Sequence, residues 1–207
     1  MCHNKNKSMQ NTEGRIERIV DVRDCIDFDK VTILTGGNGG GKSFIRKQIQ
    51  LICKNESIPC WTVSMDRRAG FDSNGTGMMV FSRDCEWLPS SINTFDQMRD
   101  FGIKTHGTYG VLDEIEIGMS EESQYGVALY INKQLEEFRK NNKGLLIITH
   151  SRYIVKYVKA DEFINLEGMT KQEWLDREIV PTDFDSLDRD STELFKALQD
   201  KMNAKRQ

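Results

Sequence analysis

The sequence lacks the features of membrane, secreted and disulfide-rich proteins. Its apolar runs, such as residues 144–148, are far shorter than the roughly 20 residues that a membrane-spanning helix needs. The polar residues 1–11 contain no apolar stretch of the kind that secretory signals carry. The five cysteines are odd in number and include no C-x-x-C pair, which argues against a disulfide framework. These absences predict a cytoplasmic protein with reduced thiols and no membrane insertion.

Linkers, repeats and a strong charge imbalance are also missing. With only three prolines and no Pro/Ser-rich stretch, nothing divides the chain of 207 residues into two large domains. The formal net charge of −3 argues against a generally basic nucleic-acid binder, but it is compatible with a local basic patch, so a nucleic-acid partner stays an open question. We expect a flexible N-terminal tail at 1–13, one domain at 14–166, and a helical C-terminal appendage at 167–207 that packs on or next to this domain.

Short apolar or β-branched runs alternate with segments of helical spacing along the chain. The predicted strands are 16–22, 31–35, 60–65, 109–112, 145–149 and 162–166. Strands that alternate with helices are typical of a mainly parallel sheet flanked by helices, so the predicted fold class is α/β. Ser120, which is followed by two glutamates, predicts the start of one long helix.

Two further helices are predicted beyond residue 166. Thr170 and Glu173 have the spacing of a capping box, which marks a helix start. Asp190 is predicted to lead a second helix, and residues 181–190 are predicted to form a solvated loop before it. One face of this second helix is predicted to contain Leu194, Phe195, Leu198 and Met202. This face is a candidate docking surface for an unknown protein partner.

A glycine-rich stretch at residues 36–43 matches the phosphate-loop pattern G-x-x-x-x-G-K-[ST]. It follows the strand-like segment 31–35 and precedes the helix-like segment 44–53, which is the context that the motif requires. Backbone N–H groups of such a loop bind phosphate, Lys42 reaches the β and γ phosphates, and Ser43 offers its hydroxyl to magnesium. The predicted ligand is ATP with Mg²⁺. The residues predicted to bind it are Gly36, Gly37, Asn38, Gly39, Gly40, Gly41, Lys42 and Ser43.

Two adjacent carboxylates, Asp113 and Glu114, end the predicted strand at 109–112. Next to a phosphate loop, this is the arrangement that a magnesium site requires. Asp113 is predicted to hold the metal together with Ser43, directly or through water. Glu114 is predicted to orient or deprotonate the attacking water. Without the phosphate loop, an exposed turn would be the better interpretation of the two carboxylates.

A third buried-type strand ends in Thr149 and His150. The carboxyl ends of parallel strands meet at one edge of the sheet, where α/β folds bind their ligands. His150 is therefore predicted to hydrogen-bond the γ-phosphate. The alternative for an isolated histidine is a structural role.

Together these motifs resemble the ABC ATPase superfamily. Residues 38–43 look like its Walker A motif, Leu112-Asp113-Glu114 followed by Gly118 looks like Walker B with the D-loop, and His150 looks like the switch histidine. The stretch 113–120 is similar to the D-E-P-E-I-G-L-S stretch of small stand-alone ABC-type ATPases, a branch broadly related to chromosome-maintenance and recombination ATPases. The resemblance covers roughly residues 14–166. It implies monomers that associate when ATP is bound and separate after hydrolysis at Glu114.

The sequence departs from this family in three places. No L-S-G-G-Q signature is present; Ser90 or Ser91 lies at about the right distance before Asp113 to be its degenerate remnant, and a helix cap is the alternative. The glutamine of the family's Q-loop has no clear match. The interval between Lys42 and Asp113 is shorter than in transporters, so the helical arm that docks on membrane subunits is short or missing.

These departures leave more than one function open. The favoured hypothesis is a soluble ATPase whose ATP-dependent homodimer drives or gates a partner. The alternatives are an ATP-dependent binding module with little turnover, and the nucleotide-binding subunit of a transporter. The base preference, ATP or GTP, is not fixed by the sequence, and neither Phe28 nor Arg15 can be assigned as an adenine contact.

Overall fold

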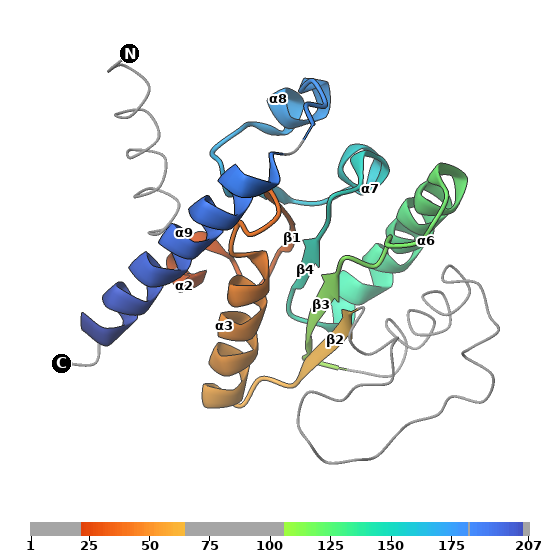
Figure 1. Ribbon diagram of the computed structural model, residues 1–207. Helices are drawn as coiled ribbons and strands as arrows, with labels where there is room; N and C mark the ends of the chain where they lie inside the picture. Colours follow the sequence, from red (N-terminus) through yellow and green to blue (C-terminus); the bar gives the residue numbers. More distant parts are fainter. Residues whose placement is uncertain (1–21, 65–105, 182, 205–207) are drawn as a thin grey trace, which may run out of the picture.

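The computed structural model describes residues 22–64, 106–181 and 183–204. Their centre is a five-stranded sheet (Figure 1). Its strands are β1 (Val31–Thr35), β2 (Cys60–Ser64), β3 (Tyr109–Asp113), β4 (Leu145–Ile148) and β5 (Glu162–Asn165). All neighbouring pairs are parallel, in the order β2-β3-β4-β1-β5. The predicted α/β class with a mainly parallel sheet is therefore confirmed.

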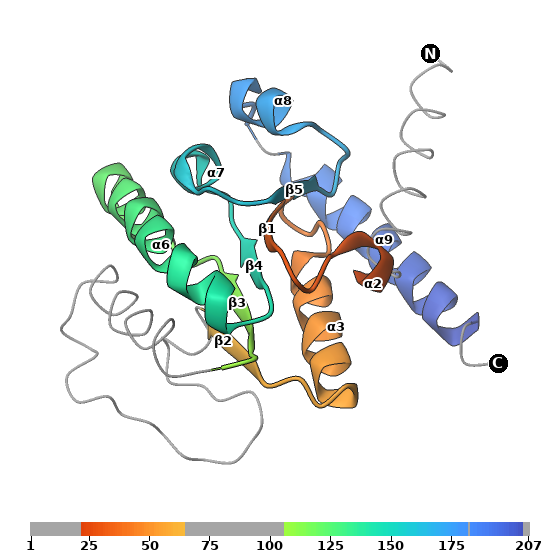
Figure 2. The same ribbon diagram turned by 180° about the vertical axis from the view of Figure 1, so that it is seen from behind.

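The sheet is covered by helices on both faces (Figures 1 and 2). They are α2 (Val22–Cys25), α3 (Lys42–Asn55), α6 (Glu121–Asn141), α7 (Arg152–Tyr157), α8 (Lys171–Asp176) and α9 (Phe184–Ala204). Side chains along β4 alternate between two apolar clusters: Leu145 and Ile147 pack with α6, α7 and α8, whereas Leu146 and Ile148 pack with α2, α3 and α9. Because both faces are covered, all four residues of β4 are buried, which explains the unbroken apolar run in the sequence.

Local sequence signals determine where several helices begin. The Ser120 side chain accepts a hydrogen bond from the Ser123 N–H, as predicted for the cap of α6. The capping box of α8 is complete, since Thr170 Oγ1 accepts the Glu173 N–H at 3.2 Å and Glu173 Oε2 accepts the Thr170 N–H at 2.7 Å.

The predicted strand at 16–22 is wrong at Val22, where the helical turn α2 begins; residues 16–21 lie outside the described part of the chain. Val22 and Ile26 are four positions apart and both are buried, which is a helical period. The Ile26 N–H donates to the Val22 carbonyl at 2.9 Å. Burial on one side of this turn therefore took precedence over the β propensity of the residues.

The last helix begins earlier than predicted. Asp183, not Asp190, stands before its first turn: its carboxylate accepts the Asp185 N–H at 3.2 Å and the Ser186 hydroxyl at 2.6 Å. Residues 184–190 are therefore the first turns of α9 rather than a solvated loop. The helix extends because Asp183 satisfies its first N–H groups, while the acidic residues that follow stay exposed.

The predicted apolar face of α9 is divided in the structure. Leu194 and Leu198 are buried in the cluster that includes Ile45 and Ile49 of α3, whereas Phe195 is 60% exposed. The two leucines thus belong to the core of this chain. Among the described residues, no helix is both long and apolar enough to span a bilayer.

Candidate functional site

Three predicted functional segments meet at one edge of the sheet because of the strand order. The glycine-rich loop follows β1, Glu114 follows β3, and His150 lies just beyond β4. Since β4 lies between β3 and β1 in the sheet, its end is adjacent to both of the others. The carboxyl ends of parallel strands are the usual ligand edge of such folds.

The loop at residues 36–43 has the backbone geometry of an anion cradle. Gly39 and Gly41 have positive φ angles of 68° and 93°, which favour glycine. Gly41 is the N-cap of the 14-residue helix α3, so the N-cap residue contributes no side-chain hydrogen bond. The Ser43 side chain lies beside the same helix end on an exposed residue. Backbone N–H groups at a helix start and the positive end of the helix dipole together suit a bound phosphate.

Lys42 is folded back over the loop. Its ammonium donates to the carbonyl oxygens of Gly36 and Gly37, both at 3.1 Å, and lies 3.8 Å from Glu114 Oε1. The residue is only 6% exposed. A largely buried cation at the end of a glycine loop favours binding of phosphate oxygens, since desolvation strengthens its attraction to negative charge.

Glu114 occupies the centre of the site in an unusual backbone conformation. Its φ is 50°, one of two positive values for non-glycine residues in the described chain, and its N–H donates to the Ile148 carbonyl at 2.9 Å. Oε1 lies 3.2 Å from His150 Nε2. A left-handed φ at a residue of this type costs free energy, and such strain is found at functional sites.

The electrostatic surroundings keep Glu114 ionised. The nearby His150 imidazole holds the pKa of the Glu114 carboxyl below its usual value, burial opposes this, and the charge of Lys42 lowers the pKa further. The side chains of Glu114 and His150 are about one-third exposed, at 31% and 34%. A water molecule therefore has access to an ionised carboxylate at this position.

Asp113, the predicted metal ligand, pairs with an arginine that sequence reasoning missed. Arg46 Nη1 donates to Asp113 Oδ2 at 2.7 Å, and both side chains are mostly buried. Arg46 lies one helical turn beyond Lys42 on α3, but no motif marks it. The guanidinium therefore pairs with the carboxylate that the sequence predicts to hold the metal.

The donor set at this edge fits magnesium. Mg²⁺ prefers oxygen ligands and is commonly held by one or two carboxylates, water and substrate phosphates. Asp113 at the end of β3 would supply the carboxylate, and Ser43 at the start of α3 would supply a hydroxyl. A cluster of three or more acidic, histidine or cysteine side chains is not needed for this mode, and the described residues contain none.

The Glu167 carboxylate, which follows β5, hydrogen-bonds to the glycine-rich loop. Glu167 Oε1 accepts the Gly37 N–H at 2.7 Å, and its own N–H donates to Asn165 Oδ1 at 3.0 Å. Asn165 in turn donates from Nδ2 to Thr35 Oγ1 at 3.0 Å. The ends of β1 and β5 are thereby tied together. No local pattern predicts this brace, because its partners are distant in sequence.

The last helix also reaches the loop. A Cβ atom placed on Gly39 would lie 1.9 Å from Ser191 Oγ, and Leu187 lies nearby. Both residues belong to α9, which Figure 1 shows beside α3. The C-terminal helix thus packs directly against the candidate phosphate loop, a contact that the sequence did not predict.

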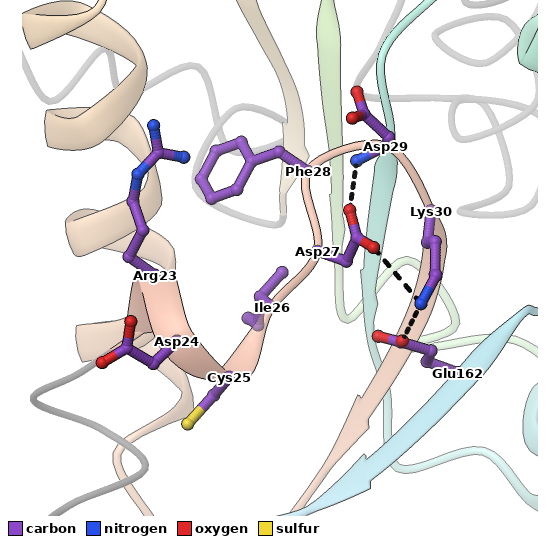
Figure 3. Close-up of a pocket in the computed structure, with 9 residues that line it drawn as sticks. All are labelled: Arg23, Asp24, Cys25, Ile26, Asp27, Phe28, Asp29, Lys30 and Glu162. Atoms are coloured by element: carbon purple, nitrogen blue, oxygen red, sulfur yellow. Dashed lines mark hydrogen bonds and ion pairs between the residues drawn. The ribbon is translucent and has the colours of Figure 1, made fainter.

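A cavity of about 400 Å³ lies at the opposite edge of the sheet, near the starts of β1 and β5 (Figure 3). Its lysine already pairs with two of its carboxylates: Lys30 Nζ lies 2.6 Å from Glu162 Oε1 and 3.2 Å from Asp27 Oδ2. Phe28 packs at 4.6 Å against the ring of Tyr109 and is 8% exposed. Phe28 thus lies near the starts of the strands, and its ring is buried against Tyr109.

The candidate signature serines, Ser90 and Ser91, lie outside the described residues.

Comparisons with known proteins add little to this site. Neither a family model nor a curated protein matches the chain. A structure titled as that of PCH-2 from C. elegans matches with 17% identity and a TM-score of 0.37, over 79% of this chain and 41% of that one. The chain therefore spans less than half the length of that protein, and a likeness this weak carries no argument. What the structure shows is an α/β fold with a parallel sheet and a glycine-rich loop between β1 and α3.

Proposed function

We propose that this chain binds ATP with magnesium at residues 36–43 and hydrolyses it, with Glu114 as the general base. The observation that carries the proposal is the meeting of three groups from the segments that follow β1, β3 and β4. Glu114 Oε1 lies 3.8 Å from Lys42 Nζ and 3.2 Å from His150 Nε2, beside the loop. A phosphate-binding cation, a carboxylate and an imidazole at one sheet edge are the parts that phosphoryl transfer to water requires.

Each residue has a distinct role in the proposed reaction. The Lys42 ammonium and the N–H groups of the loop bind the β and γ phosphates. The Glu114 carboxylate accepts a proton from water, whose oxygen attacks the γ-phosphorus as the bond to the β-phosphate oxygen breaks. His150 holds Glu114 in place and donates to the γ-phosphate. Magnesium, held by Ser43 and Asp113, would neutralise charge on the phosphates.

We further propose that the chain works as an ABC-type ATPase that forms a homodimer when ATP is bound. The support is the likeness of residues 113–120 to small stand-alone ABC-type ATPases. A binding module with little turnover is the second candidate, and the contact between Gly39 and Ser191 favours it. In that case nucleotide at the loop would be sensed through α9 and read by a different protein.

Calorimetry on Lys42→Ala tests nucleotide binding. Removal of a charge-assisted phosphate contact worth about 1.5 to 3 kcal/mol should lower the affinity for ATP at least tenfold. Lys47 is exposed on the same helix, so Lys47→Ala is a matched control for lost positive charge and should keep the affinity. Equal ATP affinity in Lys42→Ala and Lys47→Ala would refute binding at this loop.

Glu114→Gln separates the two candidate functions. It keeps the shape of the side chain but removes the base, so turnover should fall on the order of a hundredfold while ATP still binds. Glu136→Gln, at an exposed position on α6, is the control for lost negative charge. Light scattering should show a doubled mass for Glu114→Gln with ATP and not with ADP. A wild-type protein without hydrolysis, and a variant that stays monomeric with ATP, would favour the binding module.

A further inference from the structure

A buried carboxylate that the proposed reaction does not use lies beside the site. Glu116 is 6% exposed, in the loop between β3 and α6. Its Oε1 accepts two hydrogen bonds from the segment after β4: one from the Thr149 hydroxyl at 2.7 Å and one from the His150 backbone N–H at 2.8 Å. One oxygen atom thus joins the segment that carries Glu114 to the segment that carries His150.

The two segments are joined by further hydrogen bonds that complete a closed circuit. Thr149 Oγ1 accepts the Ser151 N–H at 2.9 Å, and the Ser151 hydroxyl donates to Gln124 Oε1 at 2.7 Å. Gln124 Nε2 donates to the Met119 carbonyl at 3.1 Å, and the Met119 N–H donates to the Glu116 carbonyl at 3.0 Å. A circuit of this kind holds the two segments in one relative position.

Stability alone does not account for a carboxylate at this position. Within the part of the chain that the structure describes, Glu116 Oε2 is buried and has no hydrogen-bond partner. A buried, half-satisfied carboxylate costs free energy that an apolar side chain of similar volume would not. What the carboxylate provides instead is an acceptor at one point, where the backbone of His150 and the hydroxyl of Thr149 converge.

We propose that Glu116 is a positioning residue that sets the contact between His150 and Glu114. The inference rests on the proposed function. Glu114 and Glu116 lie on one loop, where the Ile117 N–H donates to the Glu114 carbonyl at 3.3 Å. Glu116 Oε1 accepts the backbone N–H of His150, so it fixes the position of the His150 backbone. The imidazole on this backbone has its Nε2 3.2 Å from Glu114. Without this acceptor the imidazole is free to move away from the carboxylate.

A double-mutant cycle with His150→Ala tests this assignment. Glu116→Leu removes the acceptor at similar volume and should reduce kcat about tenfold to a hundredfold, the scale of a misplacement of roughly 1 Å. ADP affinity should be unchanged. In the His150→Ala background the same substitution should change kcat less than about threefold, because its effect acts through His150. An equal loss in both backgrounds would overturn the proposal and indicate a general structural role.

Glu116→Gln is the conservative rescue. Its amide oxygen can accept the same two hydrogen bonds, so it should recover most of the kcat that Glu116→Leu loses. Should Glu116→Leu fail to fold, Thr149→Val removes one donor at similar volume and should show the same dependence on His150. A Thr149→Val loss that persists in the His150→Ala background would also contradict the proposal.

A measurement without ATP separates this inference from the proposed function. The chain has three histidines, so the imidazole ¹⁵N signals of His150 are readily assigned by NMR. Glu116→Leu should shift the Nε2 signal in the direction that Glu114→Gln does, and Glu116→Gln should leave it near the wild-type position. These shifts would support the positioning role even if the wild-type protein hydrolysed no ATP. The absence of hydrolysis would refute the proposed function alone. An Nε2 signal that Glu116→Leu leaves unchanged would refute the positioning role.

Discussion

Replacement of Gly39 with alanine tests whether α9 packs against the phosphate loop in solution. A Cβ at this position would lie 1.9 Å from Ser191 Oγ and 3.0 Å from Ser191 Cβ. The hydroxyl can rotate away, but the Cβ moves only if α9 shifts. Leu194 and Leu198 resist that shift because both are 4% exposed in the core. The substitution therefore overpacks a contact between two elements that are distant in sequence.

Two costs add to the expected loss of stability. Overpacking costs about 1 to 3 kcal/mol. The left-handed φ of +68° at Gly39 adds about 1 to 2 kcal/mol for any L-residue. Gly39→Ala should thus lower the free energy of unfolding by about 2 to 5 kcal/mol. In a Ser191→Gly background, where both opposing atoms are gone, only the φ cost of about 1 to 2 kcal/mol should remain.

Urea unfolding of the wild type, Gly39→Ala, Ser191→Gly and the double variant measures the free energy of unfolding of each protein. We expect a coupling free energy of about 1 to 3 kcal/mol between positions 39 and 191. Gly126→Ala is the matched control, because Gly126 lies in α6 with nothing within 4 Å of an added Cβ, and alanine there should stabilise by about 0.5 to 1 kcal/mol. Additive effects within about 0.5 kcal/mol at 39 and 191 would refute the packing of α9 on the loop.

Three further predictions concern the site itself. His150→Ala should reduce ATP turnover and leave ADP affinity nearly intact, because ADP lacks the γ-phosphate; equal losses for both nucleotides by calorimetry would indicate a structural histidine. The pKa of Glu114 is lowered from 4.5 in the folded state, so its contribution to stability is present above pH 4.5 and is lost as the pH falls through the folded value. The stability difference between wild type and Glu114→Gln should therefore shrink in acid, and a difference independent of pH in urea titrations would contradict this. Arg46→Met removes the guanidinium from Asp113 and should lower the free energy of unfolding by about 1 to 3 kcal/mol. Millimolar Mg²⁺ should restore part of this loss. Equal effects of Mg²⁺ on the thermal unfolding of wild type and variant would argue against a shared cation position.

The strands and the main site groups could be predicted because their signals are local. Apolar runs bounded by polar residues predicted five of the strands. The glycine-rich pattern at residues 36–43 predicted the loop after β1. Lys42, Glu114 and His150 then came together for a topological reason, since parallel strands end at the same edge of the sheet.

The remaining features depend on contacts between distant segments. Nothing near Arg46 indicates that it pairs with Asp113, and nothing near Glu116 indicates that it binds the backbone of His150. The start of α9 was missed for a different reason. The aspartates after Asp183 have low helix propensity, and this local preference was outweighed by the cap and by the burial of Leu194.

The contact between Gly39 and Ser191 has a consequence for biosynthesis. Residue 39 leaves the ribosome on the order of ten seconds or more before residue 191, at typical elongation rates. During this interval the nascent chain contains the phosphate loop, and later the carboxylates and the histidine, without the helix that packs beside them. Nucleotide that reaches the loop at this stage meets a more open surface than in the finished fold. If ATP binds the loop as proposed, the order of translation allows it to bind before α9 docks.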